Sequence, residues 1–308
     1  MPIKIILDTD IGEDIDDILV TAFALNSPEF EVLGITTVDG DTQARSRIAR
    51  KVTAPFGQPH IPVAAGYPRA MPNGDRTMRP GVGVRQGELA PDEVGLPPPS
   101  ELWADELIAK VTAEHPGEVY VLTIGAMTNV GQALVRFPEA AQNVKAIVTN
   151  GGTFDFAGRP PAIGWNLRYD PLAAAVVACS EAQWVLLPEN ATRFAAWKEP
   201  ELERLRAADL PTTRLLAAAI DLWSTNKPDA TKWPHVSDLN VLAHLMGGWL
   251  EVQRGRASIK VSPGRLAELE IEHDPEGPHL LGGEVPEEKG AELRQLFMAR
   301  ILAPPREL

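Results

Sequence analysis

Short segments rich in β-branched and aliphatic residues alternate with amphipathic segments through the first part of the chain. Strands are expected at Ile3–Leu7, Glu31–Val38, Ile61–Ala65, Val119–Ile124, Lys145–Thr149 and Trp184–Leu187. Helices are expected between them at Ile15–Asn26, Thr42–Val52, Ser100–His115 with Ser100 as the N-cap, Thr128–Arg136 and Pro171–Cys179. This alternation favours parallel strands with helices on both faces. The sequence therefore predicts an α/β fold with a mostly parallel sheet.

The later part of the chain is expected to be mainly helical. Additional C-terminal helices are expected at Glu199–Ala207, Thr213–Trp223, Asp238–Met246 and Glu287–Leu302. Ser258–Val261 and Ala267–Ile271 are expected to form an antiparallel pair, and Gly66–Pro99 a long loop. We see no internal repeat and no clear linker, so we expect a single domain over residues 1–308.

Charge and cysteine content exclude several classes of protein. The formal net charge of −13 disfavours a general nucleic-acid binder, which needs a basic surface to neutralise phosphates. Cys179 is the only cysteine, which excludes an intramolecular disulfide and a thiolate zinc site. The first apolar run is too short for a signal or membrane segment, and no later run is long enough. We expect a cytoplasmic protein that binds neither nucleic acid nor membrane.

The strongest local signal is an aspartate cluster directly after the first strand. Asp8, Asp10, Asp14, Asp16 and Asp17 fall within ten positions. The carboxyl ends of parallel strands are where ligands bind in open α/β sheets. So many carboxylates repel one another unless a cation lies between them, and oxygen ligands suit Ca²⁺ or Mg²⁺. Capping of the following helix explains Asp14 or Asp16, but not Asp8 and Asp10.

Two other aspartate-rich motifs fit less well. An EF-hand loop counted from Asp8 would need Gly at its sixth position and Glu at its twelfth, where Glu13 and Leu19 stand. A haloacid-dehalogenase-type phosphatase also places Asp-x-Asp after its first strand, but Gly12 stands where Thr or Val is usual. That rival predicts Mg²⁺-dependent phosphate release and an aspartyl-phosphate on Asp8.

Several segments, in order along the chain, resemble the inosine-uridine-preferring nucleoside hydrolase family. They are D-T-D-I-G-E-D-I-D-D at Asp8–Asp17, G-I-T-T-V-D-G-D at Gly34–Asp41, L-T-I-G-A-M-T-N at Leu122–Asn129, W-N-L-R-Y-D-P-L-A-A at Trp165–Ala174 and S-D-L-N-V-L-A at Ser237–Ala243. The resemblance implies a Rossmann-like core and hydrolysis of the N-glycosidic bond of ribonucleosides to ribose and free base, in purine or pyrimidine salvage. It also implies a homodimer or homotetramer.

The resemblance also implies roles for individual residues. Ca²⁺ would be held by Asp10, Asp17, Asp238 and the backbone carbonyl of Ile124, with Asp10 as general base toward a bound water. Asp16 would bind a ribose hydroxyl, Asn166 would contact the 2′ and 3′ hydroxyls, and Asp8 would support the site from behind.

Three positions depart from the family pattern. Asp41 stands where Asn, a sugar contact, is usual; Gly164 replaces a Glu and Gly158 an Asn, both of which grip the sugar's 5′ end. The two glycines predict a ligand that is larger or differently substituted there, or weak activity on plain nucleosides. The alternative is that another residue, such as Arg159 or Arg168, fills the gap. The departures also support a rival function, a Ca²⁺- and sugar-binding homologue without turnover.

The acid that protonates the leaving base is less defined. Ser237 occupies the position where the family's purine-active members have His, so His235 is a candidate acid, although a lone His near Trp-Pro is more often a packed or surface residue. Trp233 and Trp223 could stack on a base, with core packing as the alternative for these and for Trp197. Arg79 or Arg85 could reach an anionic group on the ligand, or could be solvated loop residues.

Overall fold

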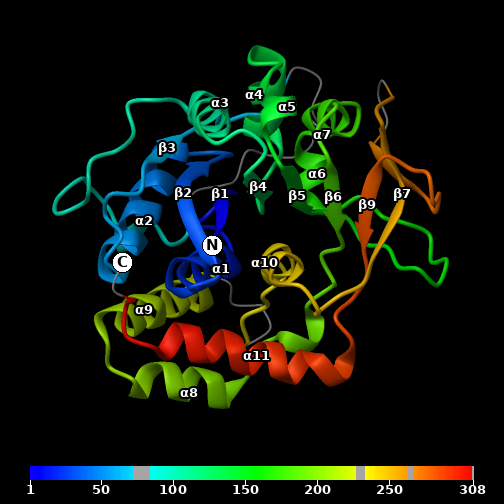
Figure 1. Ribbon diagram of the computed structural model, residues 1–308. Coiled ribbons are helices and arrows are strands. Elements are labelled where there is room, and N and C mark those ends of the chain that lie inside the picture. The colour runs from blue at the N-terminus through cyan, green and yellow to red at the C-terminus, as the bar shows by residue number, and fades with distance from the viewer. Residues whose placement is uncertain (72–83, 227–232, 263–265, 307–308) are drawn as a thin grey trace.

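A nine-stranded sheet forms the centre of the molecule (Figure 1). The computed structural model describes residues 1–71, 84–226, 233–262 and 266–306. The strand order is β3-β2-β1-β4-β5-β6-β9-β7-β8, parallel from β3 to β9, with β7 antiparallel to both neighbours. The strands are β1 (Ile3–Thr9), β2 (Phe30–Thr37), β3 (Val63–Ala65), β4 (Val119–Thr123), β5 (Ala146–Asn150), β6 (Trp184–Leu187), β7 (Val252–Lys260), β8 (Glu268–Glu272) and β9 (His279–Gly282).

Helices cover the parallel strands on both faces, as Figure 1 shows. The helices are α1 (Asp16–Asn26), α2 (Thr42–Thr53), α3 (Ala104–Glu114), α4 (Thr128–Arg136), α5 (Ala140–Asn143), α6 (Trp165–Tyr169), α7 (Pro171–Ala178), α8 (Glu199–Ala207), α9 (Pro211–Asn226), α10 (Leu239–Met246) and α11 (Glu287–Leu302), with short 3₁₀ turns at Ala54–Phe56, Gly87–Leu89 and Arg193–Ala195. Helices α3, α4 and α7 pack together on one face, and α1 contacts α2, α10 and α11 on the other.

The order of the strands fixes where a site can form. The chain runs from β1 outward through β2 to β3, and then returns to place β4 on the opposite side of β1. At such a switch point the loops that follow two neighbouring strands diverge and leave a crevice at their carboxyl ends. Here those loops begin at Asp10, after β1, and at Ile124, after β4. The mostly parallel α/β fold expected from the sequence is confirmed, and the single-domain organisation stays a prediction.

The predicted start of α3 was wrong. Ser100 does not cap it: its backbone N–H donates to the carbonyl of Val63, the first residue of β3, and its hydroxyl accepts the N–H of Leu102 at 3.1 Å. Because these bonds keep Ser100 outside the helix, α3 begins at Ala104. The N-cap is Trp103, whose N–H donates to the Glu106 carboxylate at 3.0 Å.

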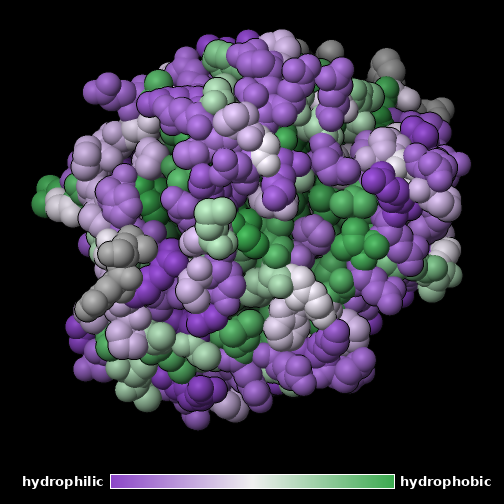
Figure 2. Space-filling model, viewed as in Figure 1, coloured by the Kyte–Doolittle hydropathy of each residue, from purple (hydrophilic) through white to green (hydrophobic). Residues whose placement is uncertain are grey.

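The C-terminal strands are longer and more numerous than predicted. The antiparallel pair is present, but β7 begins at Val252, and β9 joins it to β6. Figure 2 shows polar residues over most of the face seen in Figure 1, with apolar residues gathered near its centre. Among the helices in the described ranges, none combines the length and apolar character needed to cross a membrane.

Candidate metal and sugar site

Three buried carboxylates meet at the carboxyl end of the sheet. Asp16 and Asp17 form the first turn of α1, and Asp238 occupies the N-cap position of α10. Each offers an oxygen atom within 4.8 Å of the others. In the part of the chain that the structure describes, this is the one group of three or more acidic, His or Cys side chains with metal-binding spacing. Residues far apart in sequence thus converge at the switch point.

Each of the three carboxylates has a hydrogen-bond donor that fixes its orientation. The hydroxyl of Thr9, the last residue of β1, donates to Asp17. Asn150, at the end of β5, donates to Asp238 Oδ1 at 2.7 Å, and Ser237 donates to Asp16 Oδ2 at 2.6 Å. The donors leave the carboxylates ordered before any ligand arrives.

The electrostatics of this cluster fit a bound cation. Burial, followed by repulsion from Asp10 and Asp16, raises the pKa of Asp17 well above its ordinary value. Burial and repulsion from Asp16 and Asp17 do the same to the pKa of Asp238. Carboxylates in this situation are ionised only at a cost, which a divalent ion removes by pairing with all of them. An all-oxygen donor set suits a hard ion such as Ca²⁺ or Mg²⁺.

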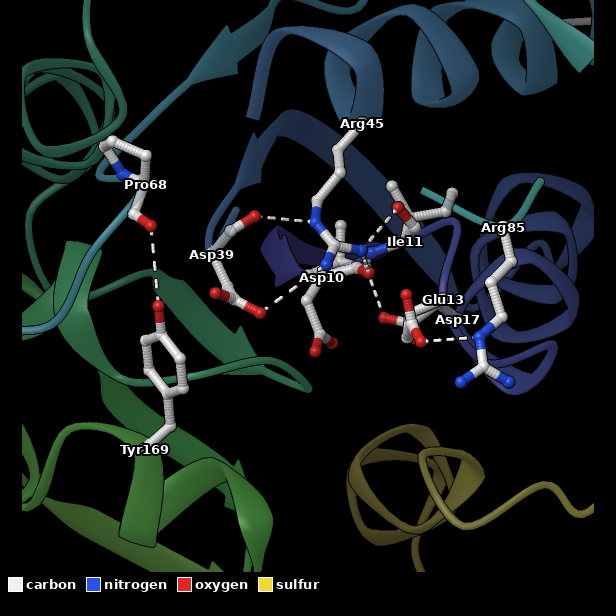
Figure 3. Close-up of polar contacts among 10 residues, drawn as sticks. Asp10, Ile11, Glu13, Asp17, Asp39, Arg45, Pro68, Arg85 and Tyr169 are labelled. Carbon is white, nitrogen blue, oxygen red and sulfur yellow. Dashed lines mark hydrogen bonds and ion pairs between the residues drawn. The ribbon is translucent and has the colours of Figure 1, made fainter. Parts of the chain in front are cut away.

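Asp10 lies beside the cluster and is linked to Arg45 (Figure 3). The buried Arg45 guanidinium donates to the backbone carbonyls of Asp10 and of Ile11, the latter at 3.0 Å, and pairs with Asp39 Oδ2 at 3.5 Å. Burial raises the pKa of Asp10 to about 7, Arg45 opposes the shift, and Asp39 and Asp16 add to it. A divalent ion bound next to Asp10 favours the charged carboxylate and therefore opposes this rise of its pKa.

Asp8 lies behind the site and is completely buried. Its Oδ1 accepts hydrogen bonds from Thr36 at 2.6 Å and Asn129 at 2.7 Å, and burial raises its pKa to about 7. A phosphatase nucleophile must reach a phosphate group from solvent, which a side chain in this position does not do. The geometry thus argues against the phosphatase rival and agrees with a supporting role.

Asn166 connects the ends of two strands. It lies in the first turn of α6, and its amide donates to the backbone carbonyls of Ile124 and Asn150, both at 2.9 Å. Asn150 in turn accepts a hydrogen bond from Asn240 at 2.6 Å. The Asn166 amide therefore ties the Ile124 carbonyl, directly after β4, to the last residue of β5.

The space expected at Gly164 is already filled. A Cβ atom built on Gly164 would overlap with Glu189 Oε1 and would lie 2.6 Å from the backbone nitrogen of Gly152. Arg159 instead pairs with Asp155 at 3.0 Å and is two thirds exposed. Gly158, with φ of 86°, has open space around it. Of the two alternatives, the one in which another residue fills the gap therefore holds at Gly164, but the side chain belongs to Glu189, which follows β6, and not to either of the two arginines named.

Other predicted contacts lie farther out or have structural partners. Asp41 is exposed, and its carboxylate caps α2 by accepting the N–H of Ala44 at 2.9 Å. His235 is exposed, and the half-buried Trp233 packs against the core that contains α1. Trp197 and Trp223 are buried in that core, as their packing alternative predicted. Roles for Asp41, His235 and Trp233 toward a ligand remain predictions.

Two loop arginines, Arg79 and Arg85, were candidates for contact with an anionic group on the ligand. Arg85 pairs with Glu13 at 2.7 Å, which ties residues 84–86 to the turn after β1 (Figure 3). Arg79 lies outside the described residues.

Sequence reasoning missed three polar residues of the site: Asp39, Asn150 and Glu189. Each comes within two residues of the end of a strand, β2, β5 and β6 respectively. The carboxyl end of each predicted strand was therefore the signal that could have identified these three residues.

Comparison with known proteins gives consistent matches. Residues 5–280 match the family model described as inosine-uridine preferring nucleoside hydrolase. Uridine nucleosidase 1 of Arabidopsis thaliana is 38% identical over 66% of this chain and 61% of its own length, so the match spans under two thirds of that relative. A pyrimidine-specific ribonucleoside hydrolase of Salmonella paratyphi A is 31% identical over 77% of this chain and 76% of its own.

Solved structures agree on the fold. A purine-preferring ribonucleoside hydrolase from Gardnerella vaginalis superposes with a TM-score of 0.79 at 22% identity, covering 97% of this chain and 98% of that one. A plant nucleoside hydrolase gives 0.76 at 23% identity, over 99% and 100%. With the family match spanning most of the sequence and the fold agreeing over nearly all of it, the chain belongs to the inosine-uridine preferring nucleoside hydrolase family.

Proposed function

We propose that the protein hydrolyses the N-glycosidic bond of ribonucleosides with the help of Ca²⁺, releasing ribose and the free base. The observation that carries the proposal is the buried group Asp16, Asp17 and Asp238 beside Asp10. The family and the two relatives named for action on uridine or pyrimidine nucleosides make uridine the first substrate to test.

The proposed ion would be held by Asp10, Asp17, Asp238 and the carbonyl oxygen of Ile124. When bound, Ca²⁺ supplies a Lewis acid that lowers the pKa of a coordinated water molecule. Asp16 is close enough to the other two carboxylates to act either as a ligand or as the acceptor for a sugar hydroxyl.

The chain's own residues then have distinct tasks. Asp16 and Asn166 orient the sugar diol, which places C1′ at a fixed position in the crevice. Asp10 accepts the proton of the attacking water, and Arg45, which binds the Asp10 backbone carbonyl, holds the residue in place. The surrounding carboxylates stabilise the positive charge that develops on the sugar ring in an oxocarbenium-like transition state. His235 is the candidate donor to the leaving base.

Release of reducing sugar from uridine, cytidine, inosine and adenosine tests the proposal. The purified protein is assayed as isolated, after chelation, and after chelation followed by Ca²⁺ or Mg²⁺. We expect activity that is lost on chelation and returns with Ca²⁺. Sugar release that survives complete removal of divalent ions would overturn the role of the metal. Ca²⁺-dependent nucleoside binding without any product would favour the non-catalytic sugar-binding homologue.

Assembly and location are further parts of the proposal. We propose a homodimer or homotetramer that acts in the cytoplasm in nucleoside salvage. Light scattering of the purified protein and fractionation of cells test these two points separately.

A further inference from the structure

Glu189 is a half-buried carboxylate on the border of the site that the proposed mechanism does not use. It follows β6, and its backbone N–H donates to the carbonyl of Gly152 at 2.8 Å. Its Oε1 accepts the N–H of Gly152 at 3.3 Å, and the backbone of Trp165 also hydrogen-bonds to its carboxylate. The side chain is therefore fixed between the turn after β5 and the start of α6.

The Glu189 carboxylate occupies the space that a side chain at position 164 would need. A side chain on Gly164 would collide with Glu189 Oε1 and with the backbone nitrogen of Gly152. A carboxylate at this point of the crevice must therefore come from Glu189. The absence of a side chain at position 164 is what lets Glu189 reach the start of α6.

Glu189 lies close to the groups assigned to the sugar. Asn166 follows Gly164 by two residues and holds the carbonyl of Asn150. The negative charge of Asp16 acts on Glu189, although Glu189 is not part of the three-carboxylate group. Arg168, which lies in α6, attracts the Glu189 carboxylate. Glu189 is thus a carboxylate near Asp16, beside the start of the helix that carries Asn166, and outside the three-carboxylate group.

Resting on the proposed function, we propose that Glu189 is a specificity-determining residue that accepts a hydrogen bond from the 5′-hydroxyl of the ribonucleoside. Its two backbone donors leave further lone pairs on the carboxylate for a ligand. A ribose held by its 2′,3′-diol at Asp16 and Asn166 has one hydroxyl left, on the exocyclic carbon. A free 5′-hydroxyl donates to this carboxylate, whereas a 5′-deoxy sugar offers it no donor.

The test compares uridine with 5′-deoxyuridine in the wild-type protein and in Glu189→Gln and Glu189→Ala. A hydrogen bond to a charged group corresponds to a preference for uridine of roughly 10- to 100-fold in kcat/KM. We expect the wild type to show this preference and both variants to lose most of it. The preference for uridine over 2′-deoxyuridine should stay unchanged in all three proteins.

A purely structural role for Glu189 gives a different pattern. Both variants would then lower kcat/KM for all three substrates by the same factor, which would overturn the proposal. Glu284→Gln is the matched control, because Glu284 contacts the neighbouring Asn190 and pairs with Arg193 at 2.7 Å outside the site. It should leave the 5′ preference intact.

Calorimetry separates this inference from the proposed hydrolysis. Binding of uridine and 5′-deoxyuridine is measured in Asp10→Asn protein, with and without Glu189→Gln. If the wild-type protein hydrolyses no nucleoside, but uridine binds more tightly than 5′-deoxyuridine only when Glu189 is present, the hydrolase proposal fails and the inference stands. Equal affinity for the two nucleosides with Glu189 intact would overturn the inference alone.

Discussion

Ser237 donates a hydrogen bond of 2.6 Å to Asp16, joining positions that are 221 residues apart in the chain. Asp16 begins α1, and Ser237 lies directly before Asp238 at the start of α10. The bond therefore aligns the first turn of one helix with the N-cap of another.

Ser237→Ala should weaken ribonucleoside binding more than metal binding. The substitution removes a hydrogen bond to a charged group, so we expect KM for uridine to rise about 10-fold. Steady-state kinetics at saturating Ca²⁺, with a parallel Ca²⁺ titration, measures both effects. Ser258→Ala is the control, because Ser258 lies on β7 and its hydroxyl donates to the Glu270 carboxylate at 3.4 Å, outside the site. An unchanged KM would show that Asp16 keeps its orientation without Ser237.

Asp10→Asn and Asp238→Asn should have different consequences. Loss of a general base typically lowers kcat by about 10²- to 10⁴-fold, which we expect for Asp10→Asn. Asp238→Asn should reduce Ca²⁺ affinity strongly, because it removes one of the cluster's charges, but most of its kcat should return at saturating Ca²⁺. Asp10→Asn, at a second proposed ligand, should also weaken Ca²⁺ binding, but its kcat should stay low at saturating Ca²⁺. Calorimetric Ca²⁺ binding and kcat at saturating Ca²⁺ distinguish the two. Full recovery of kcat at high Ca²⁺ in Asp10→Asn would contradict its role as the base.

Arg45→Ala should reduce the stability of the fold as well as activity. The guanidinium is buried, pairs with Asp39 and binds two backbone carbonyls of the turn after β1. Removing one partner of a buried ion pair costs about 3–5 kcal/mol. Urea unfolding of the chelated protein measures the change. Lys51→Ala, on the exposed side of α2, should change the free energy of unfolding by less than about 0.5 kcal/mol.

His279 should make stability depend on pH below neutrality. The buried ring accepts the N–H of Ala257 at its Nδ1 atom at 2.9 Å, and its Nε2 lies 3.0 Å from the carbonyl of Ala178. Only a neutral imidazole satisfies both partners. Burial lowers the pKa of His279 below 6.5, so the unfolded chain takes up the proton first. Stability from this residue is therefore complete above pH 6.5 and is lost as the pH falls below it.

Urea unfolding of the chelated wild type and His279→Gln at pH 7.5, 6.5 and 5.5 tests this prediction. The wild type should lose stability relative to the variant by at most about 1.4 kcal/mol per pH unit below 6.5. His60→Gln, an exposed residue, serves as the control. Parallel pH curves for wild type and His279→Gln would contradict the assignment.

Local pattern predicted most of the sheet and part of the site. The alternation of strands and helices gave the α/β class, and the aspartates after β1 marked the crevice before any contact was known. What sequence pattern did not show depends on contacts between distant segments. Glu189 and Gly164 are related only through the pairing of β5 with β6 and the turn beyond it. Strand β9 is four residues long and pairs with β6 about 95 positions earlier, so no local periodicity identifies it.

The three carboxylates of the cluster come from opposite parts of the chain, Asp16 and Asp17 near its beginning and Asp238 in its last third. A polypeptide emerging from the ribosome therefore lacks a complete cation site until synthesis has passed α10. The ion would be acquired only when the sheet has brought α1 and α10 together. Metal uptake would then report that the whole α/β core is assembled, and a truncated product would stay metal-free.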